Sequence, residues 1–479
     1  MICLALCLST FATAHAQDAP AQSAPQAPAV VTLGVDQVVD VALRRAHAIK
    51  VARAGKEHAE WQLFRADYAW LPKLTTNTFL SLVPDNADPN RFDDNIDEIF
   101  ALNVGPFVRQ TAQLVVPLYT FDRISSARGL AKLGVENAQL EITQERVNMA
   151  FDVKRAYYSL SLARTFDALV QDGNQMLQKE IKKMQEARDF GDADFKIKDL
   201  RKLQIFETEF QTRALDNQKL ETLSLAGLQY LTTTTISSEQ IPALDADAAL
   251  PGLLPVDVYV DAALRKRPEV QQLRRAVRAR ELQKELAVSA FYPNIFFAIN
   301  FSLGWSTEDV ARQPICRIPS NSQECVFTDD LFARPYADPY DQLGFGFALG
   351  LRWDLDIGQL YGKYKASKAQ LEQVHHQQVQ ALGAIELELK KDHTEADHAL
   401  KKVAIQAKRL KAAERWRNQL GLGAQQGGNV SDAIEPVRAY YEAKIRHLQA
   451  VYDYHIARAR LAKTVGVVRL RDVEPAPKK

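Results

Sequence analysis

The sequence lacks long apolar runs, a net charge and the motifs of most enzymes. No segment approaches the ~20 consecutive apolar residues that a membrane-spanning helix requires. The 60 Lys and Arg residues are balanced by 59 Asp and Glu residues, so no strong electrostatic field favours a nucleic acid. There is neither a Gly-rich phosphate loop nor a Gly-x-Ser-x-Gly motif, and no acid–base pair clusters in a plausible pocket. We therefore expect a protein that is not an enzyme and has no cofactor.

Cysteine is also scarce, and its four residues fall into two groups. Two belong to residues 1–16, whose apolar run and final Ala-His-Ala predict a cleaved signal peptide and therefore export. Residues 17–31, rich in Ala, Pro and Gln, are predicted to be a flexible leader. Cys316 and Cys325 share one polar loop, and in an exported protein such a pair is expected to form a disulfide. Two free thiols are the lesser alternative.

No metal site is expected from the histidines. His393 and His398 are spaced so that they misalign on a helix, and no cysteine or carboxylate cluster completes a set of ligands. Together with His375 and His376 they are interpreted as surface residues of a solvated helix.

The middle of the chain repeats its beginning. Asp40–Arg44 returns as Asp261–Arg265, a shift of 221, and the same shift maps Pro72 onto Pro293. Later landmarks need a shift of 237, which indicates a duplicated unit with one insertion. Each unit is predicted to contain a helix, two strands around a loop, a long helix and a further helix. The predicted parts are a first repeat over 32–241, a linker over 242–255, a second repeat over 256–467 and a tail over 468–479.

After each of those prolines the apolar period changes from helical to alternating. Strands are predicted over about 74–82, 108–119, 295–305 and 343–355. In the second pair one row is wholly apolar and the other is small or polar, which favours lipid-facing strands over a soluble sheet. The predicted lipid-facing residues are Phe297, Ile299, Phe301, Trp305, Phe345, Phe347, Leu349, Leu351 and Trp353.

Proline-free stretches over 121–190 and 193–241 predict very long helices, because about 70 helical residues span ~105 Å. Their apolar spacing is typical of coiled-coil or bundle packing. Four strands do not close a barrel, and lipid tolerates no open sheet edge, so several chains must pool their strands. Two chains would give eight strands, and three would give twelve and leave a lumen. The expected fold is a mixed α and β membrane protein: a shared β-barrel continued by a helical tube.

In this order the segments resemble the TolC-like outer-membrane efflux family. The stretches that carry the resemblance are 32–43, 71–72 with 292–293, 116–119 and 448–466. The resemblance implies a homotrimer with a 12-stranded β-barrel in the outer membrane and an α-helical coiled-coil tunnel in the periplasm. It also implies the exit duct of a tripartite efflux pump or type I secretion system. The implied partners are a periplasmic adaptor, an inner-membrane transporter of RND, ABC or MFS type, and outer-membrane lipid. The alternative is a soluble periplasmic coiled-coil adaptor or scaffold.

Two acids in the second repeat are the candidates for a gate. Asp432 and Glu435 resemble the Asp-x-x-Asp segment that lines the narrow periplasmic entrance in this family. In a trimer they would place six carboxylates around a constriction and favour cations. The alternative is that Asp432 is a helix N-cap and Glu435 completes a capping box. In the first repeat the position equivalent to Asp432 is Phe195, which has no charge, so the nearby Asp192 and Asp194 are the candidates there.

The turns between the long helices are the expected adaptor contacts, since they are the most distal loops. Plain helix turns would have the same sequence pattern. The residues concerned are Gly191, Ala193, Gly421, Leu422 and Gly423.

Overall fold

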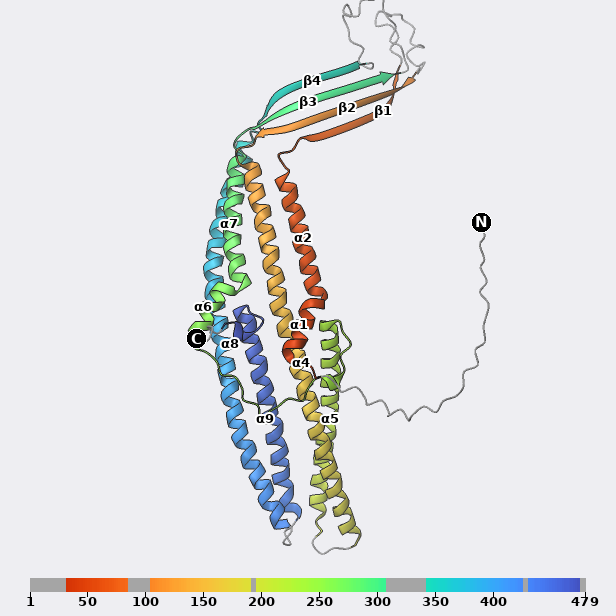
Figure 1. Cartoon of the computed structure of the whole chain (residues 1–479), viewed down its shortest axis with the longest axis vertical. Helices are drawn as coiled ribbons and strands as arrows, with labels where there is room; N and C mark the ends of the chain where they lie inside the picture. Colours follow the sequence, from red (N-terminus) through yellow and green to blue (C-terminus); the bar gives the residue numbers. More distant parts are fainter. Residues whose placement is uncertain (1–31, 85–103, 191–194, 307–341, 425–429, 474–479) are drawn as a thin grey trace, which may run out of the picture.

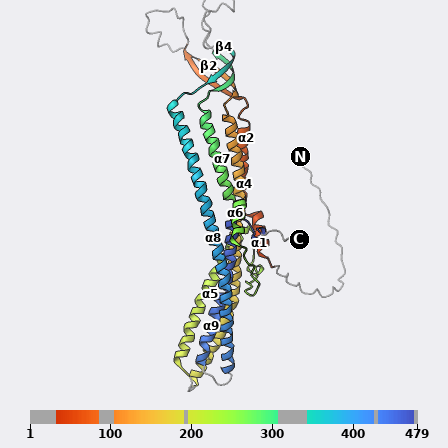
Figure 2. The same ribbon diagram turned by 90° about the vertical axis from the view of Figure 1, so that its left-hand side faces the viewer.

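The computed structural model describes residues 32–84, 104–190, 195–306, 342–424 and 430–473. Over these residues the chain is elongated, with a sheet at one end and helices that run from it to the opposite end (Figure 1). Figure 2, turned by 90°, shows the same division. No helix in these ranges has an apolar stretch of the length needed to cross a membrane. The predicted combination of four strands and very long helices in one chain is confirmed.

The sheet is antiparallel, and its strand order follows the sequence. β1 (Lys73–Pro84) pairs with β2 (Val104–Tyr119), β2 with β3 (Asn294–Ser306), and β3 with β4 (Gln342–Arg352). Each repeat thus supplies one hairpin, and the β2–β3 pairing joins the repeats. β2 begins earlier than the predicted residue 108 because its backbone stays paired with β1 as far as Pro84. β4 ends earlier than residue 355 because its partner β3 begins at Asn294, opposite Arg352.

Two very long helices lead away from the sheet. α4 (Arg123–Asp189) and α8 (Ile357–Ala424) contain 67 and 68 residues, which corresponds to about 100 Å each. The chain then turns back into α5 (Ile197–Thr232) after α4 and into α9 (Val430–Val465) after α8. In the half far from the sheet, the α4/α5 and α8/α9 pairs lie side by side, with α9 against α4 (Figure 1).

The prediction of one continuous helix at the start of each repeat is wrong. Both helices break, at Ala46 and at Arg267, which the shift of 221 relates to each other. Each of these residues has an extended ψ, 134° at Ala46 and 123° at Arg267, and the second break is followed by Pro268 at the first helical position. The four pieces are α1 (Val35–Arg45), α2 (His47–Asp67), α6 (Val256–Lys266) and α7 (Pro268–Ser289).

The apolar core follows the contacts between helices. The largest cluster joins α4, α5 and α9 and contains Phe210 and Tyr441, and smaller clusters surround α1 and α6. Gly173 lets α5 approach α4 closely, since a Cβ atom at this position would lie 2.3 Å from the ring of Phe210. These clusters hold the helical half of the chain together independently of the sheet.

The end of the chain ties the two repeats to each other. Between α9 and the short helix η2 (Leu470–Asp472), Arg469 forms ion pairs with Asp36 and Asp40 of α1, at 3.0 and 2.8 Å. From α6, the Nζ of Lys266 donates a hydrogen bond to the carbonyl oxygen of Asp472 at 2.6 Å. A further short helix, η1 (Ser238–Gln240), follows α5 and precedes the linker.

Candidate functional site

One face of the sheet is apolar across all four strands. Residues directly opposite each other on paired strands share a face, and Leu74, Leu114, Ile299 and Phe347 form one such row. The predicted apolar residues of β3 and β4 lie on this face, and Trp353 follows directly after β4. Side chains on this face are exposed at both edges of the sheet, with 77% of the surface of Leu80 in β1 and 73% of that of Phe347 in β4 accessible. A monomer in water does not normally expose such a row.

The opposite face carries mainly polar and small residues, with Phe79, Phe107 and Phe296 among them. Asn77, Thr111, Ser302 and Gly344 form a row there, and the neighbouring row contains Thr75, Gln113, Asn300 and Gly346. Glycine has a packing role at one point of this face. A Cβ atom at Gly350 would lie 2.4 Å from the ring of Phe296 on the adjacent strand. The sheet therefore has the two unlike faces that separate lipid from a water-filled lumen.

The first hairpin carries a polar pair within its apolar face. Thr78 of β1 lies opposite Gln110 of β2, and its hydroxyl donates a hydrogen bond to the Gln110 side-chain oxygen. Each of the two groups thereby satisfies part of the other's hydrogen-bonding capacity inside the sheet, which lowers the cost of removing them from water. The pair interrupts the row of apolar residues on this face of the first hairpin.

Aromatic side chains gather where the strands join the helices. The rings of Phe121 and Tyr292 stack with centroids 4.9 Å apart, and Tyr119 packs edge-on against Phe121 at 4.6 Å. The indole nitrogen of Trp353 donates a hydrogen bond to the carbonyl oxygen of Phe291 at 3.2 Å. Amphipathic rings of this kind are enriched at the boundary between membrane and water. The boundary of the apolar face therefore coincides with the strand-to-helix transition.

The predicted gate and tip residues lie at the end opposite the sheet. α9 begins at Val430, two residues before Asp432, so the N-cap interpretation of Asp432 does not fit the helix start. Glu435 is exposed on the same helix, and Pro436 lies inside it. Gly421, Leu422 and Gly423 belong to the last turns of α8 and not to a loop. Residues 191–194 and the loop with Cys316 and Cys325 lie outside the described residues.

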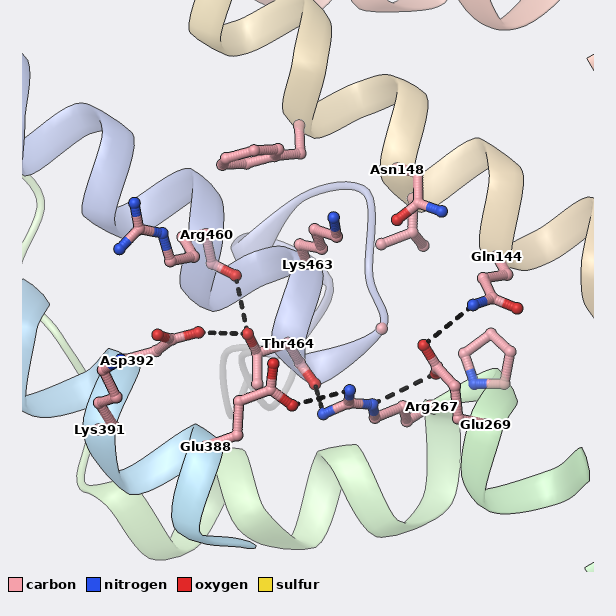
Figure 3. A pocket seen from close by; sticks show the side chains of 14 residues that line it. Gln144, Asn148, Arg267, Glu269, Glu388, Lys391, Asp392, Arg460, Lys463 and Thr464 are labelled. Carbon is pink, nitrogen blue, oxygen red and sulfur yellow. Dashed lines mark hydrogen bonds and ion pairs between the residues drawn. The ribbon is translucent and has the colours of Figure 1, made fainter. Parts of the chain in front are cut away.

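A polar cavity of about 370 Å³ lies where the break at Arg267, between α6 and α7, meets α4, α8 and α9 (Figure 3). Arg267 is its centre. Its guanidinium forms ion pairs with Glu269 at 3.2 Å and Glu388 at 2.9 Å, and donates a hydrogen bond to the Thr464 carbonyl oxygen at 3.2 Å. The Thr464 hydroxyl in turn donates to Asp392, whose pKa is raised because the carboxyl is buried.

These contacts make the cavity a structural junction. Its central groups are paired with each other, and Gly466, with φ of +85°, lets α9 end directly against Arg267, since a Cβ atom there would lie 2.7 Å from the Arg267 Cα. Sequence reasoning missed this network, although Arg267-Pro268 was a visible signal of a break. Within the described residues no group of three or more metal-ligating side chains is placed to hold an ion. His393, interpreted from sequence as a surface residue, lies 2.9 Å from the carbonyl oxygen of Leu254 and is half-buried.

Titratable groups with strongly shifted pKa values lie between α4 and α9. The ring of His455 stacks on Tyr158 with centroids 4.3 Å apart. Burial and, to a smaller extent, the charge of the nearby Arg458 lower the pKa of His455 to about 4. Burial likewise lowers the pKa of Lys154 to about 8. His455 is therefore neutral at pH 7 where it stacks on Tyr158.

Comparison with known proteins agrees with the geometry. Residues 259–467, which cover most of the second repeat, match the family model described as outer membrane efflux protein. Over these residues the chain is similar to the outer membrane efflux protein family. The resemblance inferred from sequence is thereby confirmed. Among curated proteins no match was found.

Solved structures share the fold of this chain at low sequence identity. The open state of the MtrE outer membrane channel of Neisseria gonorrhoeae is 16% identical, with a TM-score of 0.70 over 92% of this chain and 91% of that one. A membrane protein from Pseudomonas aeruginosa is 15% identical, with a TM-score of 0.69 over 94% and 97%. CusC is 13% identical, with a TM-score of 0.69 over 90% and 92%. The predicted fold class, strands of a barrel continued by long helices, is confirmed.

Proposed function

We propose that the protein is the outer-membrane exit channel of a tripartite efflux pump or type I secretion system. The observation that carries the proposal is the sheet, which has one apolar face, one polar face and two free edges, β1 and β4. Lipid tolerates no open edge, so β4 of one chain must pair with β1 of the next. Three chains then form a 12-stranded barrel with the polar face inward, and the helices extend into the periplasm.

Unpartnered apolar side chains on the long helices support assembly of several chains. Large apolar residues are exposed on the sides of α5 and α8 that face away from their partner helices, as expected for faces that pack between chains. These residues are Ile197, Ile205, Leu215, Leu223 and Tyr230 of α5, and Val379, Leu387, Ile405 and Trp416 of α8.

The partners of such a channel are a periplasmic adaptor and an inner-membrane transporter. The adaptor is proposed to contact the helical ends around Gly191 to Ala193 and Gly421 to Gly423. Asp432 and Glu435 are proposed to narrow the entrance, and solutes or polypeptides then cross the outer membrane without a catalytic step. A soluble periplasmic adaptor or scaffold would have no use for a sheet whose exposed face is largely apolar.

A pair of substitutions on one strand tests the proposal. Leu349→Arg places a charge on the apolar face of β4, whereas Ala348→Arg places the same charge on the polar face. An arginine facing lipid costs about 2–4 kcal/mol per chain. We expect the unmodified protein, purified in detergent, to be a trimer that conducts ions across a planar bilayer. Ala348→Arg is expected to retain conductance and Leu349→Arg to lose insertion. A monomer that stays soluble without detergent and never conducts would instead support the soluble scaffold.

A further inference from the structure

A second cavity, of about 540 Å³, lies between α4, α5 and α9 in the half of the chain far from the sheet. α5 and α9 both pack against α4, one on each side (Figure 1). Its walls are mainly apolar and include the half-buried side chains of Phe166 and Val170 from α4, Leu220 from α5 and Ile445 from α9. The volume falls within the range of about 300–1,000 Å³ that is typical of sites for small molecules.

The helices around this cavity are joined by polar contacts at its walls. Asn217 of α5 is only 6% exposed, and its amide nitrogen donates a hydrogen bond to the carbonyl oxygen of Ala163 in α4 at 2.9 Å. The hydroxyl of Tyr452 in α9 lies 3.0 Å from the hydroxyl of Ser159 in α4. Both α5 and α9 are therefore fixed to α4 at the cavity. A site formed in advance lowers the entropic cost of binding a ligand.

The charged residues that line the cavity are mostly unpaired. One of the four, Glu442, forms an ion pair with Arg438 at 3.2 Å. The other three are exposed and form no ion pair or hydrogen bond with the part of the chain that the structure describes: Arg213 and Asp216 of α5, and Arg446 of α9. Two unpaired cations against one unpaired acid leave one positive charge in excess, with an arginine on each of the two outer walls.

The cavity lies on the side of α4 that is turned away from the linker. The Ser161 hydroxyl donates a hydrogen bond to the carbonyl oxygen of Pro242 in the linker at 2.8 Å. Val170 follows Ser161 by nine residues, which is about two and a half helical turns and places it on the opposite side of α4. Three copies of the linker inside a tube would obstruct it, so the linker belongs outside and the cavity faces the lumen.

A neighbouring chain does not cover the cavity. In the proposed ring, the exposed apolar side chains of α5, such as Leu215, pack against the next chain. Leu215 is two residues from Asn217, about 200° around the helix, so this contact lies on the side of α5 away from α4. The cavity is therefore built by a single chain and stays open in the assembly.

We propose that this cavity binds an organic monoanion with an apolar body, such as an aromatic carboxylate. The apolar walls bury the body, and Arg213 and Arg446 donate charge-assisted hydrogen bonds to the acidic group. Asp216 balances one of the two arginines, so a single negative charge leaves the site neutral. Binding depends on the cavity alone, whereas the position of the cavity in a lumen rests on the proposed function and makes the ligand a solute that the channel carries.

Titration of the full-length protein in a non-ionic detergent, by calorimetry at pH 7, tests the proposal. The probe is 2-naphthoate. Two further ligands separate its features: 2-naphthamide retains the apolar body without the charge, and acetate retains the charge without the body. The protein variant is Arg213→Gln/Arg446→Gln. The matched control is Arg53→Gln/Arg65→Gln, the same change at two exposed arginines of α2. A titration of detergent alone corrects for partition of the probe into micelles.

We expect 2-naphthoate to bind the unmodified protein and the control equally, and to bind Arg213→Gln/Arg446→Gln about tenfold more weakly. Val170→Trp, which fills the cavity without removing an arginine, is expected to weaken binding as well. The two comparison ligands are expected to bind at least tenfold more weakly than 2-naphthoate. No binding of 2-naphthoate, equal binding to the cavity variants, or equal binding of 2-naphthamide would overturn the proposal.

The two proposals fail in different ways. A trimer that conducts but binds no 2-naphthoate removes this inference and leaves the proposed function intact. A protein that binds 2-naphthoate through Arg213 and Arg446 but never conducts retains the site and removes the channel.

Discussion

The two repeats build the same turn from different chemistry. In the first repeat Ala46 lies at the break between α1 and α2, only 2% exposed, inside a wholly apolar cluster with Val39 and Ile49. In the second repeat the equivalent residue is Arg267, which forms ion pairs with two glutamates beside a polar cavity. The backbone path is therefore set by the duplicated fold, while the side chains that stabilise it have diverged. One repeat depends on burial and the other on paired charge.

The largest loss of stability is expected when the arginine of the second helix break is placed at the equivalent position of the first. Ala46→Arg would bury a guanidinium among apolar side chains that offer no carboxylate, and we expect it to lower the free energy of unfolding by about 4 kcal/mol. The measurement is denaturant unfolding in detergent, followed by circular dichroism. His47→Arg is the control, since it puts the same side chain at an exposed adjacent position. If both variants lost the same stability, the two breaks would not differ in the way their surroundings indicate.

The sequence predicts a strand or a helix break when the residues that cause it are neighbours in the chain, and not when they are far apart. Alternation of large apolar residues with glycine in β4 is a local signal, and it correctly predicted a strand with two unlike faces. The break at Arg267 also had a local signal in Pro268. The break at Ala46 had none, because it follows from the packing of α1 against α4. The contact between Arg267 and Thr464 joins residues 197 positions apart, and no local pattern records it.

An intermediate effect is expected from pH, at the contact between the repeats. His455 of α9 stacks on Tyr158 of α4, and burial lowers its pKa to about 4. The position 237 residues earlier, Gln218 in α5, is exposed and does not titrate. The unfolded chain binds a proton near pH 6.5, so the stability is complete above that pH and is lost as the pH falls from 6.5 to 4. The shift corresponds to about 3 kcal/mol.

The pH effect is measured as apparent unfolding free energy between pH 7 and pH 4. His455→Phe retains an aromatic ring against Tyr158 without a titrating group, so the variant should lose less stability over this range. The positive charge of the neighbouring Arg458 adds to the cost of protonating His455. His398→Gln, on the exposed side of α8, serves as the control and should retain the full slope. An unchanged slope in His455→Phe would assign the acid sensitivity to other groups.

The smallest effect is expected on ion selectivity, from the acidic residues at the ends of the two repeats far from the sheet. The second repeat has Asp432 and Glu435 on the first turns of α9, whereas the position equivalent to Asp432 in the first repeat is Phe195, just before α5. If only the second repeat supplies a ring of carboxylates, then Asp432→Asn/Glu435→Gln should lower the cation preference of the channel about twofold in planar bilayers under a salt gradient. Asp192→Asn/Asp194→Asn, the same change of charge in the first repeat, should have a smaller effect. Equal shifts from both variants would mean that both repeats contribute to the constriction. No shift from either would leave Asp432 and Glu435 as residues of a helix start whose charge the permeating ions do not sense.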